Sequence, residues 1–287
     1  MPEFSAGQST VTTSALRYED LTQDGRLMPI ALPPTMSGLW RDVLTEHAGA
    51  RNALRTGVIP IMTRLTLITT DQAIHVNRPV EAKAGFELAH DRDANGEVSR
   101  LFMNVWTEVR GAAGRIGPNS KPGGLAFAGR VFAEHTFTRL LAPPDQRKVT
   151  RLGVDGYPDV PEVRHQPPPP TTAQDAPAGA DWLDELAPDV TGYDLTLDQT
   201  DSNQHVNSLV YIRIFLDAVN RRLAASGRPG KLRSRAVDIA YRKPSFAGEQ
   251  IRAQLRLYDG ADGLGAAGLI AGDDGKPRCY VRVAIGP

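Results

Sequence analysis

The stretch Asp201-Ser202-Asn203-Gln204-His205-Val206-Asn207 is polar and runs directly into the mostly apolar residues 208–219. The apolar run predicts a mostly buried helix that begins just after Asn207. An acid, an amide and an imidazole therefore stand at alternate positions before a helix N-terminus, where backbone N–H groups lack partners and the helix dipole favours negative charge. Groups that move protons thus lie beside groups that bind carbonyl oxygens, so we take this stretch as the candidate site.

The composition is that of a globular chain with no strong charge bias. It has 287 residues, 41% of them hydrophobic, with 33 Lys+Arg and 33 Asp+Glu. The balanced charge argues against a nucleic-acid surface, and the single cysteine, Cys279, excludes an intrachain disulfide and a multi-cysteine metal site. No signal-peptide pattern or apolar run of about 18 residues is present. We therefore expect a cytoplasmic protein without a membrane span.

A proline-rich segment divides the chain. Residues 154–180 include four consecutive prolines, Pro167 to Pro170, and favour an extended spacer over a packed core. The sequence thus predicts an N-terminal half over 1–153, a linker over 154–180 and a C-terminal half over 181–287.

The second half predicts one long helix and several strands. A short helix is expected at 181–186 and a strand at 193–197, and the long helix should end near Ser226-Gly227. β-like runs follow at 234–242, 249–258, 265–271 and 278–285. Their short turns require antiparallel neighbours, so we predict an α+β half with a helix on one face of a sheet.

The first half suggests a weaker version of the same order. A strand is expected at 15–21, a helix near 37–50, and strands at 59–70, 80–90 and 100–110. Residues 111–129 predict a loop or an insertion, and 130–141 fit either a strand or a helix. Tyr18-Glu19-Asp20-Leu21-Thr22 echoes Tyr193-Asp194-Leu195-Thr196, which indicates a faint internal repeat.

The motif Asp201-x-Asn203-x-His205-Val206-Asn207, with Tyr211 four residues on, resembles the signature of acyl-ACP thioesterases. The block Ala240-Tyr241-Arg242-Lys243-Pro244-Ser245-Phe246-Ala247-Gly248-Glu249 resembles the strand–loop–strand that follows the helix in hotdog thioesterases. The resemblance implies a tandem (double) hotdog, in which each half is an antiparallel sheet wrapped around a central helix. It also implies one catalytic half, the second, with the first half forming a wall of the acyl pocket.

Two positions depart from that family. Plant acyl-ACP thioesterases carry a Glu before the strand tyrosine and a Cys four residues after it, whereas this chain has Ala240 and Ser245. A cysteine mechanism is therefore not expected, and a strict preference for acyl-ACP is in question.

Thioester hydrolysis needs a water, a base and donors to an oxyanion. We expect Asp201 to be the general base or, as a lesser alternative, a nucleophile, and His205 to orient or deprotonate the water. Asn203 would hold the carbonyl or the water. If the segment is extended, these three side chains point to one side.

Other groups complete the predicted site. The backbone N–H groups of Val206 and Asn207 are the expected oxyanion donors, and Asn207 is also the expected helix N-cap. Tyr211 and Ser245 are candidates for substrate binding, although a core role for Tyr211 has more in its favour. No cofactor and no metal are expected, because the histidines are scattered without ligand spacing.

A near-copy of the motif occurs at Asp71-Gln72-Ala73-Ile74-His75-Val76-Asn77. Ala73 replaces the amide, and Arg78-Pro79 is followed by strand-like sequence. Without a helix N-terminus there is no oxyanion site, so we interpret this copy as structural.

The sequence predicts a thioesterase that takes an acyl-CoA or acyl carrier protein substrate. A hotdog enoyl hydratase or dehydratase is one alternative, and a non-catalytic protein that binds an acyl or polyketide group is another. Hotdog units pair, and two units in one chain satisfy that pairing, so either a monomer or a homodimer fits.

Overall fold

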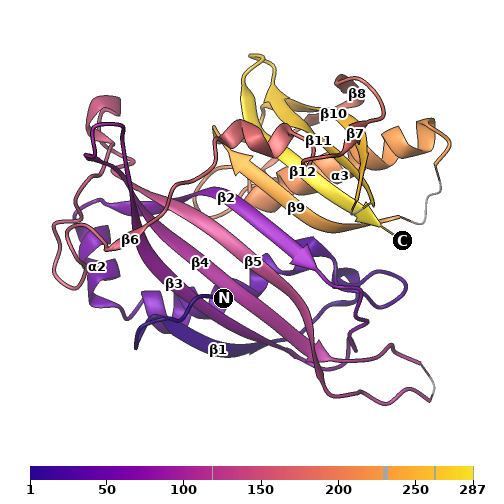
Figure 1. Cartoon of the computed structure of the whole chain (residues 1–287), viewed down its shortest axis with the longest axis horizontal. Coiled ribbons are helices and arrows are strands. Elements are labelled where there is room, and N and C mark those ends of the chain that lie inside the picture. Colours follow the sequence, from indigo (N-terminus) through magenta and orange to yellow (C-terminus); the bar gives the residue numbers. More distant parts are fainter. Residues whose placement is uncertain (118, 229–231, 262, 287) are drawn as a thin grey trace. The chain divides into compact units, whose positions relative to one another are not determined.

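The computed structural model describes residues 1–117, 119–228, 232–261 and 263–286 (Figure 1). The chain forms two compact units: the first holds Met1–Leu27, Ala31–Thr63 and Thr69–Pro168, and the second holds Met28–Ile30, Arg64–Ile68 and Pro169–Pro287. The α-helices are α1 (Ser37–Leu39), α2 (Ala48–Arg55) and α3 (Ser208–Ala225). The strands are β1 (Ser9–Ser14), β2 (Ile59–Thr69), β3 (Val80–Arg92), β4 (Val98–Ala112), β5 (Leu125–Thr138), β6 (Val163–Arg164), β7 (Asp181–Trp182), β8 (Ala187–Asp194), β9 (Arg233–Tyr241), β10 (Gln250–Gly260), β11 (Gly263–Gly272) and β12 (Pro277–Gly286).

The first unit is built on a long antiparallel sheet in the order β1-β3-β4-β5-β2. Phe86, Met103 and Val105 are almost fully buried on one face of it. Its helical part is not one regular helix: α1 continues into a π-helical segment, η4 (Trp40–Leu44), and α2 starts afresh at Ala48. The helix predicted near 37–50 is therefore present in interrupted form.

The predicted strand at 15–21 is wrong. The first strand is β1, and a 3₁₀ turn (Tyr18–Asp20) occupies the predicted position. The cause is local, because the Arg17 N–H donates to Asp20 Oδ2 at 2.8 Å and this side-chain cap closes a turn.

The region 111–129 is only partly a loop. Strand β4 runs to Ala112 and β5 starts at Leu125, so the hairpin extends into the region from both sides. Residues 130–138, for which both a strand and a helix were open, belong to β5. Within the predicted loop, residue 118 lies outside the described residues.

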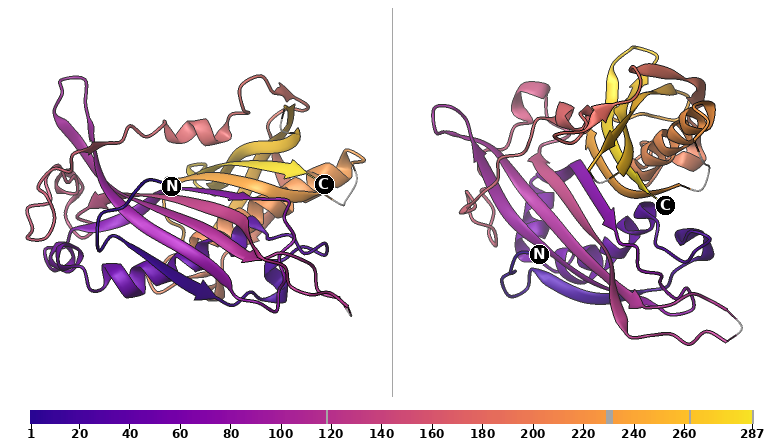
Figure 2. Two further views of the ribbon diagram at one scale, coloured as in Figure 1. Left: turned by 60° about the horizontal axis from the view of Figure 1, so that its bottom comes forward. Right: turned by 45° about the vertical axis from the view of Figure 1, so that its right-hand side comes forward.

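The second unit is a sheet in the order β9-β12-β11-β10, with residues 64–68 of β2 paired to β9 and with β7 and β8 paired to β10. Figure 2 shows α3 lying against one face of this sheet. The buried side chains of α3 are Tyr211, Ile212, Ile214, Phe215, Ala218, Val219 and Leu223. Burying a large apolar side chain stabilises a fold by about 1.5–3 kcal/mol, so this face is the main attachment of α3.

Two predictions near the start of the second half fail. Residues 181–186 were expected to be helical, but Asp181 and Trp182 form β7 and pair with β10. The Trp182 ring packs under the Arg256 guanidinium, 3.4 Å from its centroid, which favours the strand. Strand β8 ends at Asp194, so the predicted strand at 193–197 is displaced towards the N-terminus, and a 3₁₀ turn (Leu197–Gln199) follows.

The proline-rich segment is divided between the two units, 154–168 in the first and 169–180 in the second, and each part contacts its own unit. In the first unit β6 pairs with β3, and His165 Nε2 lies 2.7 Å from Glu134 Oε2. In the second unit Arg64 donates to Thr172 Oγ1 at 3.3 Å. Both parts are therefore docked, although the segment contains little regular structure.

Each unit joins an antiparallel sheet to helical segments, as the α+β prediction requires. Among the described residues, no helix is long and apolar enough to cross a membrane.

The buried imidazole of His135 predicts a pH-dependent stability. Burial lowers its pKa to about 4 from 6.5. Between these values the unfolded chain binds the extra proton, so stability falls as the pH drops from about 6.5 to 4, by about 3 kcal/mol in all. His135→Asn keeps a donor for the carbonyls of Met103 and Ala133 but cannot titrate. Urea unfolding at several pH values, followed by tryptophan fluorescence, should show a flatter pH dependence for the variant; equal slopes would contradict this account.

The N-cap of α3 gives a second prediction. Asn207 Oδ1 accepts the Leu209 N–H at 2.9 Å, which confirms the predicted cap. Asn207→Ala should lower the free energy of unfolding by about 1 kcal/mol, whereas Asn207→Asp should cost much less because it keeps the acceptor. Urea titrations of both variants test this, and equal losses would show that the cap bond is not what matters.

Candidate functional site

The stretch before α3 is a tight turn and not an extended segment. Thr200 and Val206 form an isolated antiparallel bridge, Asp201 N donates to the His205 carbonyl at 3.0 Å, and Gln204 N donates to the Asp201 carbonyl at 2.9 Å. Gln204 has φ +65°, a conformation that costs a non-glycine residue free energy. The condition under which these three side chains would point to one side, an extended segment, is therefore not met.

The turn brings the acid and the imidazole together. Asp201 Oδ1 and His205 Nδ1 are 4.0 Å apart, with the side chains 26% and 40% exposed. His205 Nδ1 also lies 3.4 Å from the Val206 carbonyl, so this nitrogen faces the turn. No hydrogen bond from His205 Nε2 to a described residue is present, which leaves that nitrogen for a ligand.

Asn203 is placed differently. Its backbone N–H donates to Asp201 Oδ1 at 2.8 Å, which holds the carboxylate in the turn. Its side chain is exposed and makes no hydrogen bond with a described residue. The residue thus supports Asp201 through its backbone, and binding of water or a carbonyl by its amide stays a prediction.

The predicted oxyanion donors are both engaged. Val206 N donates to the Ser245 carbonyl at 2.8 Å, and Asn207 N donates to the Gln199 carbonyl at 2.9 Å. In this structure each of these two N–H groups already has a carbonyl partner, and their use as oxyanion donors stays a prediction. At the start of α3, no bond from the Ser208 N–H to a described residue is present.

Tyr211 and Ser245 lie in the interior. Tyr211 is 3% exposed and Ser245 is fully buried. The Tyr211 hydroxyl accepts the Ser245 N–H at 2.9 Å, and the Ser245 hydroxyl has no hydrogen-bond partner among the described residues. Both residues hold the segment beside the turn, and their binding of substrate stays a prediction.

Ala240 faces away from α3. On β9, Tyr241 donates to the Ser208 carbonyl at 3.1 Å, whereas Asp238, three residues earlier, pairs with Arg64 on the opposite face. Side chains alternate along a strand, so Ala240 shares the face of Asp238. A side chain at position 240 would not point towards the helix.

The near-copy at 71–77 leads into a strand. Strand β3 begins at Val80, His75 is buried, and Asp71 is exposed near Arg26. No helix N-terminus follows His75. The turn therefore lacks the element that makes the second motif a candidate.

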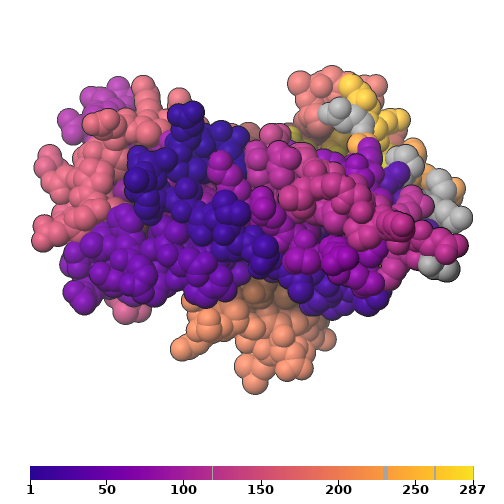
Figure 3. Space-filling view, turned by 90° about the horizontal axis from the view of Figure 1, so that it is seen from below, coloured from indigo at the N-terminus to yellow at the C-terminus, as the bar shows by residue number. Residues whose placement is uncertain are grey.

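Other chemical groups are disposed as follows. Cys279 is fully buried, and burial raises the pKa of its thiol, so it stays protonated and unreactive. The described residues contain no group of three or more His, Cys, Asp or Glu side chains able to hold a metal ion. Figure 3 shows part of the orange segment that contains α3 open to solvent on one face.

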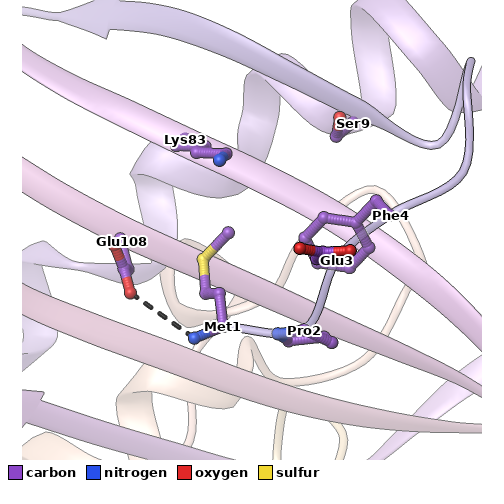
Figure 4. Close-up of a pocket in the computed structure, with 7 residues that line it drawn as sticks. All are labelled: Met1, Pro2, Glu3, Phe4, Ser9, Lys83 and Glu108. Atoms are coloured by element: carbon purple, nitrogen blue, oxygen red, sulfur yellow. Dashed lines mark ion pairs between the residues drawn. The ribbon is translucent and has the colours of Figure 1, made fainter.

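A hollow of about 480 Å³ lies in the first unit. In Figure 4 the N-terminal amine points to Glu108, with 3.6 Å between Met1 N and Glu108 Oε1. None of the motif residues contributes to it. The hollow is lined by Met1, Pro2, Glu3, Phe4, Ser9, Lys83 and Glu108.

Two partners of the turn were not predicted from the sequence. The carbonyl of Gln199 holds Asn207, and the hydroxyl of Tyr241 holds the first residue of α3. Every residue has a backbone carbonyl, so the sequence cannot show which one will accept a given hydrogen bond. Tyr241 does stand in the strand–loop block, and its aromatic ring with a polar end was the available signal.

The chain matches no protein-family model. No curated protein matches its sequence.

Solved structures resemble it along its full length. A protein from Lactobacillus plantarum described as an oleoyl thioesterase is 14% identical, with a TM-score of 0.65 over 98% of this chain and 97% of that one. An acyl-ACP thioesterase from Bacteroides thetaiotaomicron is 15% identical, with a TM-score of 0.60 over 97% and 98%. The 12:0-ACP thioesterase from Umbellularia californica is 13% identical, with a TM-score of 0.59 over 99% of both chains. The predicted resemblance and fold class are confirmed: this chain has the tandem hotdog fold of acyl-ACP thioesterases.

Proposed function

We propose that this protein is a thioesterase that hydrolyses an acyl thioester to a free acid and a thiol. The observation that carries the proposal is the pairing of Asp201 with His205 at 4.0 Å, in a turn immediately before the central helix. The full-length likeness to thioesterase structures supports this reaction class through the fold alone.

His205 is the proposed general base. Its Nδ1 faces the Asp201 carboxylate and the Val206 carbonyl, so a proton on Nδ1 leaves Nε2 as the acceptor. Asp201 would then hold the ring and stabilise the imidazolium that forms. This assignment differs from the expectation from the sequence, in which Asp201 itself takes the proton.

The proposed reaction has two steps. Water attacks the thioester carbon while Nε2 of His205 accepts its proton, which gives a tetrahedral oxyanion. The oxyanion collapses, the C–S bond breaks, and the imidazolium returns the proton to the departing sulfur. Asn203, exposed beside Asp201, is the proposed polar contact for the water or the carbonyl.

The oxyanion donor in this scheme is the Ser208 N–H. It is the first amide of α3 and benefits from the positive end of the helix dipole. The Leu209 N–H already donates to Asn207 Oδ1, so it is not available to an oxyanion.

The proposed substrates are acyl groups on coenzyme A or on an acyl carrier protein. The acyl-ACP thioesterase structures favour the carrier protein. Ala240 and Ser245, in place of the Glu and Cys expected from that family, leave the choice of carrier to experiment.

Thiol release from acyl-CoA and acyl-ACP of several chain lengths tests the proposal. Loss of a general base lowers rates by about 10²–10⁴-fold, so His205→Ala should reduce kcat by that order. Asp201→Asn should reduce kcat by a smaller factor. Asp71→Asn in the near-copy is the matched control and should retain full activity.

The other outcomes separate the alternatives. Equal activity of wild type and His205→Ala on every substrate would rule out this site. Loss of enoyl absorbance from crotonyl-CoA without thiol release would identify a hydratase. Tight acyl binding without turnover would identify a binding protein. If Asp201→Asn abolishes hydrolysis while His205→Ala stays active, Asp201 is the base.

A further inference from the structure

Two hydrogen bonds link the core of the second unit to the candidate site. The Ser245 N–H donates to the Tyr211 hydroxyl at 2.9 Å, and the Ser245 carbonyl accepts the Val206 N–H at 2.8 Å. Val206 directly follows His205. A single backbone unit, Ser245, thus connects a side chain of α3 with the turn.

The three residues of this connection are shielded from solvent. Tyr211, Ser245 and Val206 are 3%, 0% and 2% exposed. Bonds between buried groups have no water to replace them, so breaking one leaves an unsatisfied polar group. The Tyr211 ring also packs edge-on against Tyr241, with 6.1 Å between centroids, which limits its movement.

The rest of the segment is held from other directions. The Arg242 N–H donates to the Arg278 carbonyl at 2.8 Å, and the Gly248 N–H donates to the Leu195 carbonyl at 2.7 Å. These bonds hold the two ends of residues 242–248. Between them, the Tyr211 hydroxyl is the side-chain group that holds Ser245.

The Tyr211 hydroxyl is unsuited to acid–base chemistry. Burial raises the pKa of Tyr211, so it remains a phenol near neutral pH. Because its oxygen already accepts the Ser245 N–H, its role in this structure is to place that backbone unit.

We propose that Tyr211 is a positioning residue for His205, acting through Ser245 and Val206. Its hydroxyl sets the place of the Ser245 carbonyl, the carbonyl holds Val206, and the imidazole of the preceding residue keeps its position opposite Asp201. The catalytic consequence rests on the proposed thioesterase function, whereas the structural link does not.

Tyr211→Phe removes the acceptor and keeps the ring. Tyr258→Phe is the matched control, because its buried hydroxyl donates to the Val283 carbonyl at 3.0 Å, away from the turn. Misplacing a catalytic group by about 1 Å can cost about 10²-fold, so Tyr211→Phe should lower kcat about 10- to 100-fold. KM should stay within about twofold, since the change affects the chemical step more than binding. Tyr258→Phe should leave both constants near wild type.

Amide hydrogen exchange gives a readout that needs no activity. In Tyr211→Phe the Val206 and Ser245 amides should exchange at least about tenfold faster than in Tyr258→Phe, once global stability is matched. In the wild type the two amides should exchange together. If Val206 opens while Ser245 stays protected, or if Tyr211→Phe matches Tyr258→Phe in exchange, the link is refuted. If exchange changes but no substrate is hydrolysed even by the wild type, the proposed function fails and the link stands.

Discussion

The hydrogen bond from the Val206 N–H to the Ser245 carbonyl is the constraint on which the candidate site depends. It joins the end of the turn to a segment that follows the next strand along the chain. The bridge between Thr200 and Val206 closes the same turn from within. Together these contacts hold Asp201 and His205 near each other even though both side chains are partly exposed. They also hold Gln204 in its unfavourable backbone conformation.

The two motif copies differ in the element that follows each of them. Both contain an acid and a histidine at the same spacing before Val-Asn. In the second unit the turn ends on a capped helix of regular geometry, α3. In the first unit the copy passes through Arg78-Pro79 into β3, and the helical region near residue 40 is interrupted by a π-helical segment. A helix N-terminus next to the acid–histidine pair is therefore a property of the second copy.

The sequence predicted features that depend on local pattern. The apolar run after Asn207 gave α3 and its cap, and the turn residues between β-like runs gave the antiparallel sheet. Other features depend on distant partners. The N–H groups of Val206 and Asn207, which were predicted to be oxyanion donors, donate to the carbonyls of Ser245 and Gln199, and residue types do not reveal such partners. Strand β1, with the sequence STVTTS, is a polar edge strand recognisable only through its pairing with β3.

The substitutions at 240 and 245 also acquire a physical meaning. Ala240 lies on the sheet face opposite α3, where Asp238 and Arg64 already form a buried ion pair, so an acid there would lie among those charges and not at the turn. Ser245 acts through its backbone: its N–H donates to the Tyr211 hydroxyl and its carbonyl accepts the Val206 N–H. Any residue with an N–H and a carbonyl can make these two bonds. The turn thus needs no titratable group from that strand to hold its shape. A reaction at this site would depend on how rigidly the backbone holds His205 opposite Asp201, and that rigidity is determined by the hydrogen bonds of Ser245.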